Sequence, residues 1–486
     1  MRLAAFASSV LAALLAAPFA IGAHAAAGSA TLPLKPCHVE GTKLEVRCGR
    51  IQVPENRNGS NRAKPGGRML TLEVVVAPAR KGPSKEPIFL LSGGPGQDAT
   101  REAGFAGSYA NDEHDIVLVA LRGTGKSTLL QCELGGNDAH PEEYMEPLFH
   151  DGARYAECAK ALSPRADLAQ YTTMASMQDL DEVRKALGYD KVDLYGGSYG
   201  TRAGIVYMHM FPRNVHLAVL SGISAITERG PLYHAQSAQR SLDILFAQCA
   251  ADAGCHKAFP DPKGDYAAIV DTLNKHPARV TIKNPANGKP LTLTLTATAF
   301  SAGLRVMLYD EATGRRLPLL LKGARAGEYT PFAQLAYENG RGLKDSIALG
   351  LDLSVTCAED VSRIRPEEVA PLTAGSFMGD WRVRGQMAAC SVWPKAPLPA
   401  EYTAPFTNDT PVLFISGNLD PVTPPHWAED AQKNFPNSLR VVMPGAHVSD
   451  NDCVDTLIKQ FLKTADPKGL DTACVAKTRL PAFALK

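Results

Sequence analysis

Short hydrophobic runs recur along the first half of the chain, with polar or helix-spaced segments between them. Two runs, 50–53 and 71–76, alternate apolar and polar positions and indicate half-buried strands. Others are almost continuously apolar, which is typical of strands buried on both faces of a sheet. These buried runs lie at 87–91, 115–120 and 216–220, and a shorter buried strand holds Val192 and Leu194.

Helical spacing separates several of these strands. Met177, Leu180, Val183 and Leu187 follow the three-to-four-residue repeat of an amphipathic helix, and Gly188 is suited to end it. A second helix is predicted to follow the strand of Val192 and Leu194, after the glycine-rich turn, and to run to about Phe211. Strands that alternate with helices predict an α/β fold with a mostly parallel, doubly wound sheet.

This alternation stops at about residue 223. Up to residue 404 the pattern predicts helical pieces, at 235–250 and 266–273, and a threonine-rich, strand-like stretch at 291–298. The alternation then returns with a strand at 411–415, a helix near 427–434 and a strand at 439–443. We therefore expect a core formed by residues 26–222 and 405–486, with an inserted, largely helical cap domain at 223–404.

The N-terminal 25 residues differ from the rest. Arg2 precedes a run rich in alanine and leucine, and Ala23-His24-Ala25 fits a signal-peptidase site. Residues 1–25 are therefore predicted to be a signal peptide, which implies export to a periplasm or to the medium. The alternative is a retained membrane anchor, but Pro18 and the many alanines make a weak span.

The ten cysteines contain no C-x-x-C pair, which argues against a zinc site and against a thioredoxin-like redox site. In an exported chain, an even number of cysteines suggests disulfides, although the sequence alone cannot choose among the possible pairings. Our hypothesis joins cysteines that follow one another along the chain. The pairs are Cys37–Cys48, Cys132–Cys158, Cys249–Cys255, Cys357–Cys390 and Cys453–Cys474.

The charge balance gives no sign of a polyanionic partner. Lysine and arginine number 51 and aspartate and glutamate 50, which argues against binding to nucleic acid or to an anionic membrane surface. Gly125-Lys126-Ser127 resembles the end of a phosphate-binding loop, but Ala120 stands where that motif needs a glycine. No metal and no cofactor is expected.

The first candidate catalytic residue follows the short strand that holds Val192 and Leu194. Residues 196–200 read Gly-Gly-Ser-Tyr-Gly, a G-x-S-x-G motif between a strand and a helix. This is the context of a nucleophile elbow, a turn so tight that glycines must flank the serine. Ser198 is therefore the candidate nucleophile, and the Tyr199 N–H is a candidate donor to an oxyanion.

A serine hydroxyl becomes a good nucleophile only when a base takes its proton and an acid orients that base. In α/β hydrolases the acid follows the serine along the chain, and the histidine base follows the acid. Asp420 comes soon after the strand at 411–415, and His447 comes soon after the strand at 439–443. His426 is the alternative base, but it follows two prolines at a helix start and not a strand. The sequence therefore predicts a Ser198–Asp420–His447 triad.

A second oxyanion donor is expected from the loop that follows the strand at 87–91. That loop, residues 92–96, reads Ser-Gly-Gly-Pro-Gly, and its glycines allow the backbone to approach a substrate closely. Gly94 is the first choice for the donor and Gly93 the second.

Taken together, five motifs resemble those of the secreted tripeptidyl aminopeptidases and of the broader proline iminopeptidase group of α/β hydrolases. They are SGGPG (92–96), RGTGKS (122–127), GGSYGTR (196–202), GNLDPVTPP (417–425) and PGAHV (444–448). The resemblance implies a serine exopeptidase that releases short peptides or single residues from free N-termini. It also implies cap acids that bind the substrate ammonium, for which Glu228, Glu359 and Asp360 are the candidates.

Two other functions remain open at this stage. An esterase or other acyl hydrolase of small molecules would use the same triad, and a binding protein could keep a hydrolase scaffold without catalysis. The resemblance does not fix how many residues are released, and the sequence gives no oligomeric state.

Overall fold

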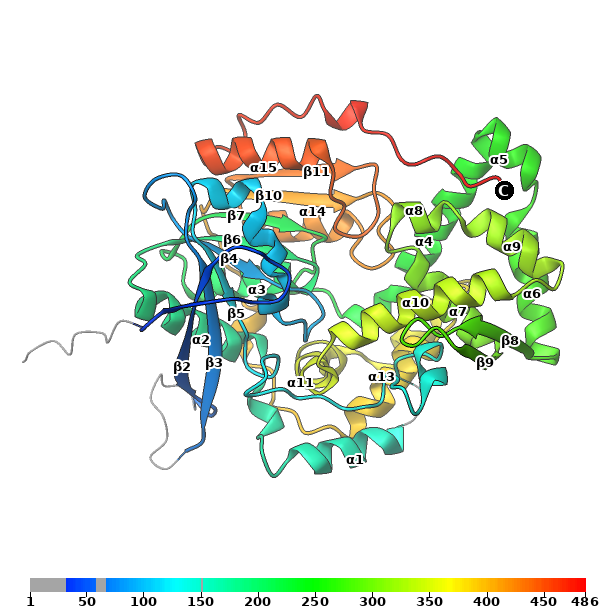
Figure 1. The fold of residues 1–486 in the computed structure, drawn as a ribbon, viewed down its shortest axis with the longest axis horizontal. Coiled ribbons are helices and arrows are strands. Elements are labelled where there is room, and N and C mark those ends of the chain that lie inside the picture. The colour runs from blue at the N-terminus through cyan, green and yellow to red at the C-terminus, as the bar shows by residue number, and fades with distance from the viewer. Residues whose placement is uncertain (1–31, 58–66, 150–151) are drawn as a thin grey trace, which may run out of the picture.

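The computed structural model describes residues 32–57, 67–149 and 152–486, and shows one large sheet with a mainly helical body beside it (Figure 1). The expected signal peptide, residues 1–25, lies outside the described residues. Within the described ranges, no helix is both long enough and apolar enough to cross a bilayer.

The large sheet has nine strands in the order β1-β2-β3-β5-β4-β6-β7-β10-β11. Neighbouring strands from β5 to β11 pair in parallel, while β1, β2 and β3 form an antiparallel edge that joins β5. The predicted α/β class with a mostly parallel sheet is therefore confirmed. The strands are β1 Lys35–Cys37, β2 Val46–Pro54, β3 Met69–Ala77, β4 Ile88–Leu91, β5 Ile116–Val119, β6 Val192–Gly197, β7 Val215–Ser221, β10 Val412–Gly417 and β11 Ser438–Met443.

The position of β4 and β5 in the middle of this sheet explains why their sequences are continuously apolar. Every side chain of β4 and β5 is buried, because helices or turns cover both faces. Leu90 of β4 lies opposite Leu118 on one side and Tyr195 on the other, so the three strands stay in register.

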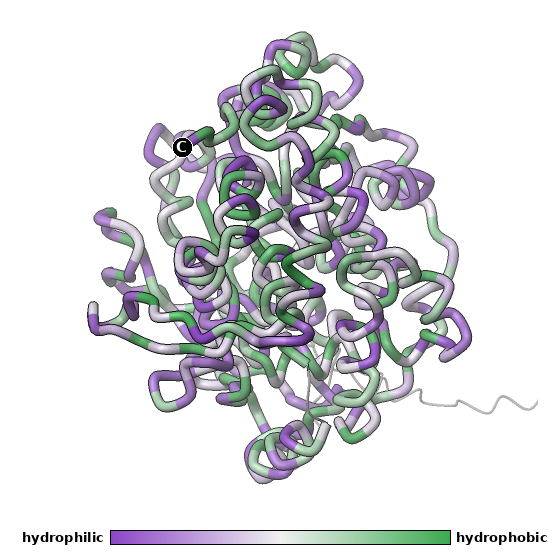
Figure 2. The backbone as a smooth tube through the Cα atoms, turned by 90° about the vertical axis from the view of Figure 1, so that its right-hand side faces the viewer, coloured by the Kyte–Doolittle hydropathy of each residue, from purple (hydrophilic) through white to green (hydrophobic). Residues whose placement is uncertain are grey.

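Helices cover both faces, which makes the sheet doubly wound. The hydrophobic cluster on one face includes Met177 of α2, Ile205 of α3 and Ala428 of α14. The cluster on the other face includes Ile458 and Phe461 of α15. The covering helices are α2 Thr173–Leu187, α3 Tyr199–Met210, α14 His426–Gln432 and α15 Asp452–Thr464, and α1 Gly152–Leu162 lies further out. In Figure 2 hydrophilic segments lie mainly on outer turns, whereas many hydrophobic segments run through the interior.

Between β7 and β10 the chain forms the second body, which has a hydrophobic cluster of its own with Phe300 and Phe332 stacked 3.9 Å apart. Its helices are α4 Gly230–Ala251, α5 Ala253–Ala258, α6 Pro262–Lys275, α7 Ala297–Met307, α8 Glu311–Gly314, α9 Leu317–Arg325, α10 Thr330–Ser346, α11 Leu349–Glu359, α12 Pro366–Thr373 and α13 Trp381–Val392. A two-stranded sheet, β8 Ala278–Lys283 and β9 Pro290–Leu295, lies among them. We call this body the cap.

The strand-like stretch expected at 291–298 ends earlier than predicted. β9 stops at Leu295, and the Thr296 hydroxyl accepts a hydrogen bond from the Ala299 N–H, which starts α7. Threonine favours strands, but at this position its hydroxyl acts as a helix N-cap.

All ten cysteines are joined, each to its neighbour along the sequence. Each bridge closes a loop of at most 33 residues, so none ties distant parts of the chain together. The pairs are Cys37–Cys48, Cys132–Cys158, Cys249–Cys255, Cys357–Cys390 and Cys453–Cys474.

The C-terminal tail connects the two bodies. Cys474 is bonded to Cys453 of α15, and the chain then runs across to the cap near α5 and α9 (Figure 1). There Phe483 is buried with the Arg315 guanidinium 4.0 Å from its ring centroid, and the Ala484 N–H donates to the Arg315 carbonyl at 3.3 Å.

A buried charge network fixes the loop after β5. The fully buried Arg122 donates to both carboxylate oxygens of Asp179 at 2.7 and 2.8 Å, and to the backbone carbonyls of Pro54, Glu55 and Gln170. Arg57 pairs with the same carboxylate. A buried carboxylate stays ionised only when such partners satisfy it.

We predict that Arg122→Met lowers the free energy of unfolding by about 3 kcal/mol, the low end for a broken buried pair, because Arg57 still pairs with Asp179. Denaturant unfolding of the oxidised protein measures this change. Arg325→Met, at an exposed position on α9, is the control and should change it by less than about 0.5 kcal/mol. Equal losses in the two variants would contradict the role given to the buried network.

Candidate active site

Ser198 stands on a strained turn between β6 and α3. Its backbone has φ 54° and ψ −125°, in the region that residues with a side chain rarely adopt. The Ser198 N–H donates to the Ser221 carbonyl at 2.9 Å, which ties the turn to β7. The turn therefore presents the side chain at the carboxyl end of the sheet.

The two outer glycines of the motif are required by close backbone contacts. A Cβ atom on Gly200 would lie 1.9 Å from the Leu91 carbonyl oxygen, and one on Gly196 would lie 2.6 Å from the Gly200 carbonyl oxygen. No side chain fits at either distance. The packing of α3 against the end of β4 therefore explains the sequence pattern of the elbow.

Asp420 and His447 meet beyond the ends of β10 and β11. The His447 Nδ1 lies 2.8 Å from the Asp420 Oδ2, and Asp420 is fully buried. The same histidine nitrogen is 3.2 Å from the Thr423 hydroxyl, which also donates to Asp420 Oδ2 at 2.8 Å. Asp420 thus orients the imidazole through Nδ1, which leaves Nε2 free to accept a proton.

The pKa of Asp420 is below its usual value although the residue is buried. Burial alone would raise this pKa, but the His447 charge and the hydrogen bonds from His447, Thr423 and Val422 outweigh burial. The carboxyl group is therefore ionised at neutral pH. Thr423 was not foreseen from the sequence; an Asp-x-x-Thr turn is the signal that could have found it, because aspartate often accepts from the third residue after it.

Ser198 and His447 line the same cavity. A Cβ atom on Gly222 would lie 3.3 Å from the His447 ring, so this backbone lies against the imidazole. Within the described part of the chain no hydrogen bond joins the Ser198 hydroxyl to His447. Rotation of the serine side chain changes the direction of its hydroxyl, and such contacts often tighten only in the substrate complex.

The glycine loop after β4 lies beside the serine. A Cβ atom on Gly93 would be 3.3 Å from the Ser198 Cβ, and Gly94 has φ 107°, which favours glycine. Both line the cavity together with Tyr199. The Tyr199 N–H, at the first position of α3, has no partner within its own helix.

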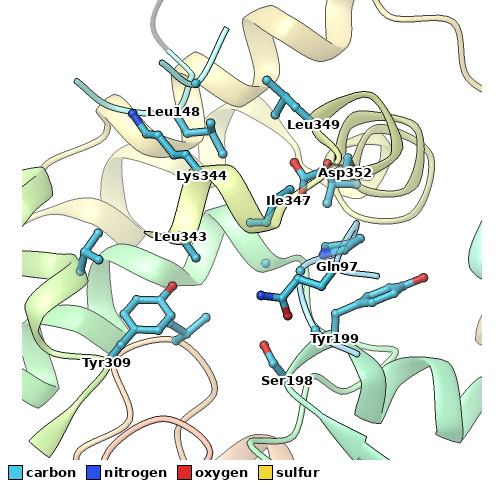
Figure 3. A pocket seen from close by; sticks show the side chains of 18 of the residues that line it. Gln97, Leu148, Ser198, Tyr199, Tyr309, Leu343, Lys344, Ile347, Leu349 and Asp352 are labelled. Atoms are coloured by element: carbon cyan, nitrogen blue, oxygen red, sulfur yellow. Dashed lines mark hydrogen bonds between the residues drawn. The ribbon is translucent and has the colours of Figure 1, made fainter. Parts of the chain in front are cut away.

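The cavity between the sheet and the cap has a volume of about 600 Å³, which is ample for a small ligand. Figure 3 shows Ser198 below the open space, with Tyr309 across from it and Gln97 close by. Leu343, Lys344 and Ile347, from the end of α10 and just beyond it, lie above.

The three acids considered for the substrate ammonium do not share one environment. Glu228 and Asp360 line the cavity, where Arg202 lies 2.8 Å from Asp360 Oδ1 and 3.7 Å from Glu228 Oε2. Burial raises the pKa of Glu228 to about 8, although Arg202 and the Ser224 hydroxyl oppose this rise. Glu228 therefore holds a proton in a large part of the molecules at neutral pH.

Glu359 is a correction to the sequence expectation. Its carboxylate does not line this cavity, because it accepts from the Thr173 N–H and hydroxyl at 2.6 Å each and from the Tyr402 hydroxyl at 2.9 Å. Thr173 is the first residue of α2, so Glu359 places negative charge at a helix N-terminus. Its role is structural.

The cap also holds the histidine loop directly. Glu311 of α8 accepts from the Ala446 N–H at 2.7 Å and from the Ser449 hydroxyl at 2.6 Å. The backbone N–H of His447 donates to the Tyr309 carbonyl at 3.2 Å. The Tyr309 ring packs edge-on against the imidazole, with the ring centroids 5.1 Å apart. Sequence reasoning missed both residues, because nothing local connects position 311 to position 446.

Two family models match the chain. The model described as alpha/beta hydrolase fold matches residues 86–255, and the model described as TAP-like protein matches residues 375–474. The first therefore covers the nucleophile elbow, and the second covers the strand ends that carry Asp420 and His447.

Three curated relatives show where the similarity extends. The serine protease Hip1 of Mycobacterium tuberculosis is 25% identical over 480 residues, which cover 89% of each chain. The tripeptidyl aminopeptidase of Streptomyces lividans is 26% identical over 37% of this chain and 35% of its own. The proline iminopeptidase of Xylella fastidiosa is 23% identical over 40% of this chain and 45% of its own.

The fold and the family matches define an α/β hydrolase, as the sequence predicted. More closely, the chain is a serine hydrolase that is similar to peptidases of this fold, and its C-terminal segment matches the TAP-like model. The resemblance noted from the five motifs is therefore confirmed.

We predict that Glu311→Ala reduces the rate of Ser198 labelling by a fluorophosphonate about 10-fold, because the loop that carries His447 loses two hydrogen bonds to a charged group. Glu311→Gln should recover most of this rate, since its amide oxygen still accepts. The time course of labelling measures both. Glu328→Ala, at an exposed cap position, is the control; a positioning role is excluded if all three variants label like the parent.

Proposed function

We propose that this protein is an exported serine aminopeptidase that releases short peptides, of the tripeptidyl type, or single residues from free N-termini. Ser198 attacks the scissile carbonyl, and His447 takes its proton and then passes it to the leaving amine. Asp420 orients the imidazole, and the N–H groups of Gly94 and Tyr199 stabilise the oxyanion. The curated relatives named as peptidases support this choice of substrate class.

The observation that carries the aminopeptidase assignment is the acid pair Glu228 and Asp360 on the wall of the cavity that holds Ser198. Arg202 pairs with both acids, and Arg363 Nη2 lies 3.7 Å from Asp360 Oδ1, so the charges balance once both carboxylates are ionised. The carboxylate oxygens can still accept hydrogen bonds from a substrate ammonium. Arrival of the ammonium favours loss of the proton from Glu228, because an adjacent cation stabilises the ionised carboxyl group.

Export is proposed from two features. The N-terminal residues have the pattern of a signal peptide, and ten cysteines form five disulfides, which persist in oxidising compartments. The protein then works in a periplasm or outside the cell.

We predict that Ser198→Ala lowers turnover of an aminoacyl or tripeptidyl anilide by about 10³-fold or more while the protein stays folded. Steady-state kinetics measure the loss of turnover, and circular dichroism shows whether the variant stays folded. Ser391→Ala, at an exposed serine of α13, is the matched control. Retained turnover in Ser198→Ala would remove this serine from the mechanism.

We predict that acetylation of the substrate amine abolishes cleavage, and that Glu228→Gln raises KM for the free-amine substrate about 10-fold through loss of a charged contact. Glu401→Gln, at an exposed acid, should leave KM unchanged. Parallel assays with short acyl esters identify an esterase: rapid ester cleavage together with equal rates on free and acetylated peptides would reject the aminopeptidase.

A further inference from the structure

A second group of charged side chains lines the same cavity, and the triad does not use it. Arg305 of α7 and Arg382 of α13 come from separate cap helices. Arg305 Nη2 donates to the Tyr309 hydroxyl at 2.9 Å, and Tyr309 packs against His447. Both arginines therefore line the site, and Arg305 contacts the tyrosine that packs against the histidine.

Neither arginine forms a salt bridge with a described residue. Throughout the described ranges, no carboxylate lies within 4.0 Å of the guanidinium of Arg305 or Arg382, whereas Arg202 in the same cavity is paired. Arg305 is only 8% exposed and its Nε–H is buried without a partner. Arg382 uses one N–H on the Gln386 side-chain oxygen and packs over the Phe149 ring at 4.6 Å.

The nearby titratable groups do not cancel this charge. Burial, together with the nearby Arg305, lowers the pKa of Arg382 to about 10, which leaves Arg382 a cation at neutral pH. Burial raises the pKa of Asp352 to about 7 against the effect of Arg382, and Asp352 Oδ2 has no partner. Burial and the arginines also lower the pKa of His234, which is therefore neutral. At least one positive charge remains in excess.

An unpaired buried cation is costly, and a planar guanidinium matches a carboxylate with two parallel hydrogen bonds. We infer that Arg305 and Arg382 form a subsite for a carboxylate of the peptide substrate, an inference that rests on the proposed peptidase function. The cavity then recognises two charges of its substrate: the ammonium at Glu228 and Asp360, and a carboxylate at the arginine pair. This selects either a short peptide with a free C-terminus or a peptide with an acidic side chain near the cleaved bond.

Matched peptides test this subsite. One pair differs only in a C-terminal carboxylate or amide, and a second pair has Glu or Gln at one position with the C-terminus amidated. We expect kcat/KM to favour the carboxylate member of at least one pair by about 10-fold, which corresponds to 1.4 kcal/mol. The pair that shows the preference identifies the source of the carboxylate.

Variants assign the preference to the two arginines. Arg305→Gln and Arg382→Gln should each bring the carboxylate-to-neutral ratio close to one. Arg315→Gln is the matched control, because Arg315 is also buried without a carboxylate partner but does not line the cavity. A ratio near one in the parent protein, or an equal fall in Arg315→Gln, overturns the inference. Arg305→Lys and Arg382→Lys, which keep the charge, are used if a glutamine variant does not fold.

Binding separates this inference from the proposed function. Calorimetry with the Ser198→Ala protein gives dissociation constants for the same peptide pairs without cleavage. Tighter binding of the carboxylate member supports the subsite even if the parent protein shows no peptidase activity, which would overturn only the proposed function. Equal binding of both members, in a protein that does cleave peptides, overturns only the subsite.

Discussion

The active site depends on one close contact between backbones. The first turn of α3 packs so tightly against the end of β4 that a single carbon at Gly200 would overlap the Leu91 carbonyl. This contact fixes the direction in which Ser198 leaves the sheet and brings the loop 92–96 beside it. The positive φ of Ser198 is the local strain that this packing maintains.

The cap contributes to the chemistry as well as covering it. Tyr309 and Glu311 supply backbone and side-chain acceptors to the loop that carries His447, and Arg202, from the core helix α3, pairs with an acid at the end of a cap helix. The catalytic loop is thus held from both bodies. A displacement of the cap would change the position of the base and the shape of the cavity at the same time.

The sequence predicted the parts of the site that depend on local structure. Ser198, Asp420 and His447 each follow a strand of the parallel part of the sheet, and the carboxyl ends of parallel strands meet at one edge of a sheet. It could not separate Glu359 from Asp360, because successive helical residues point about 100° apart and only the packing decides which one faces the cavity. Arg305 and Arg382 were missed for a related reason: 76 residues separate them, and neither belongs to a motif.

The C-terminal tail gives the molecule a mechanical property. It is anchored at one end by the Cys453–Cys474 bond on the core and at the other by Phe483 beneath Arg315 on the cap. Since the cap is also connected through the polypeptide on either side of its insertion, the tail acts as an additional tether. It limits how far the two bodies can separate, so the last dozen residues help to hold the cap against the core that carries Ser198.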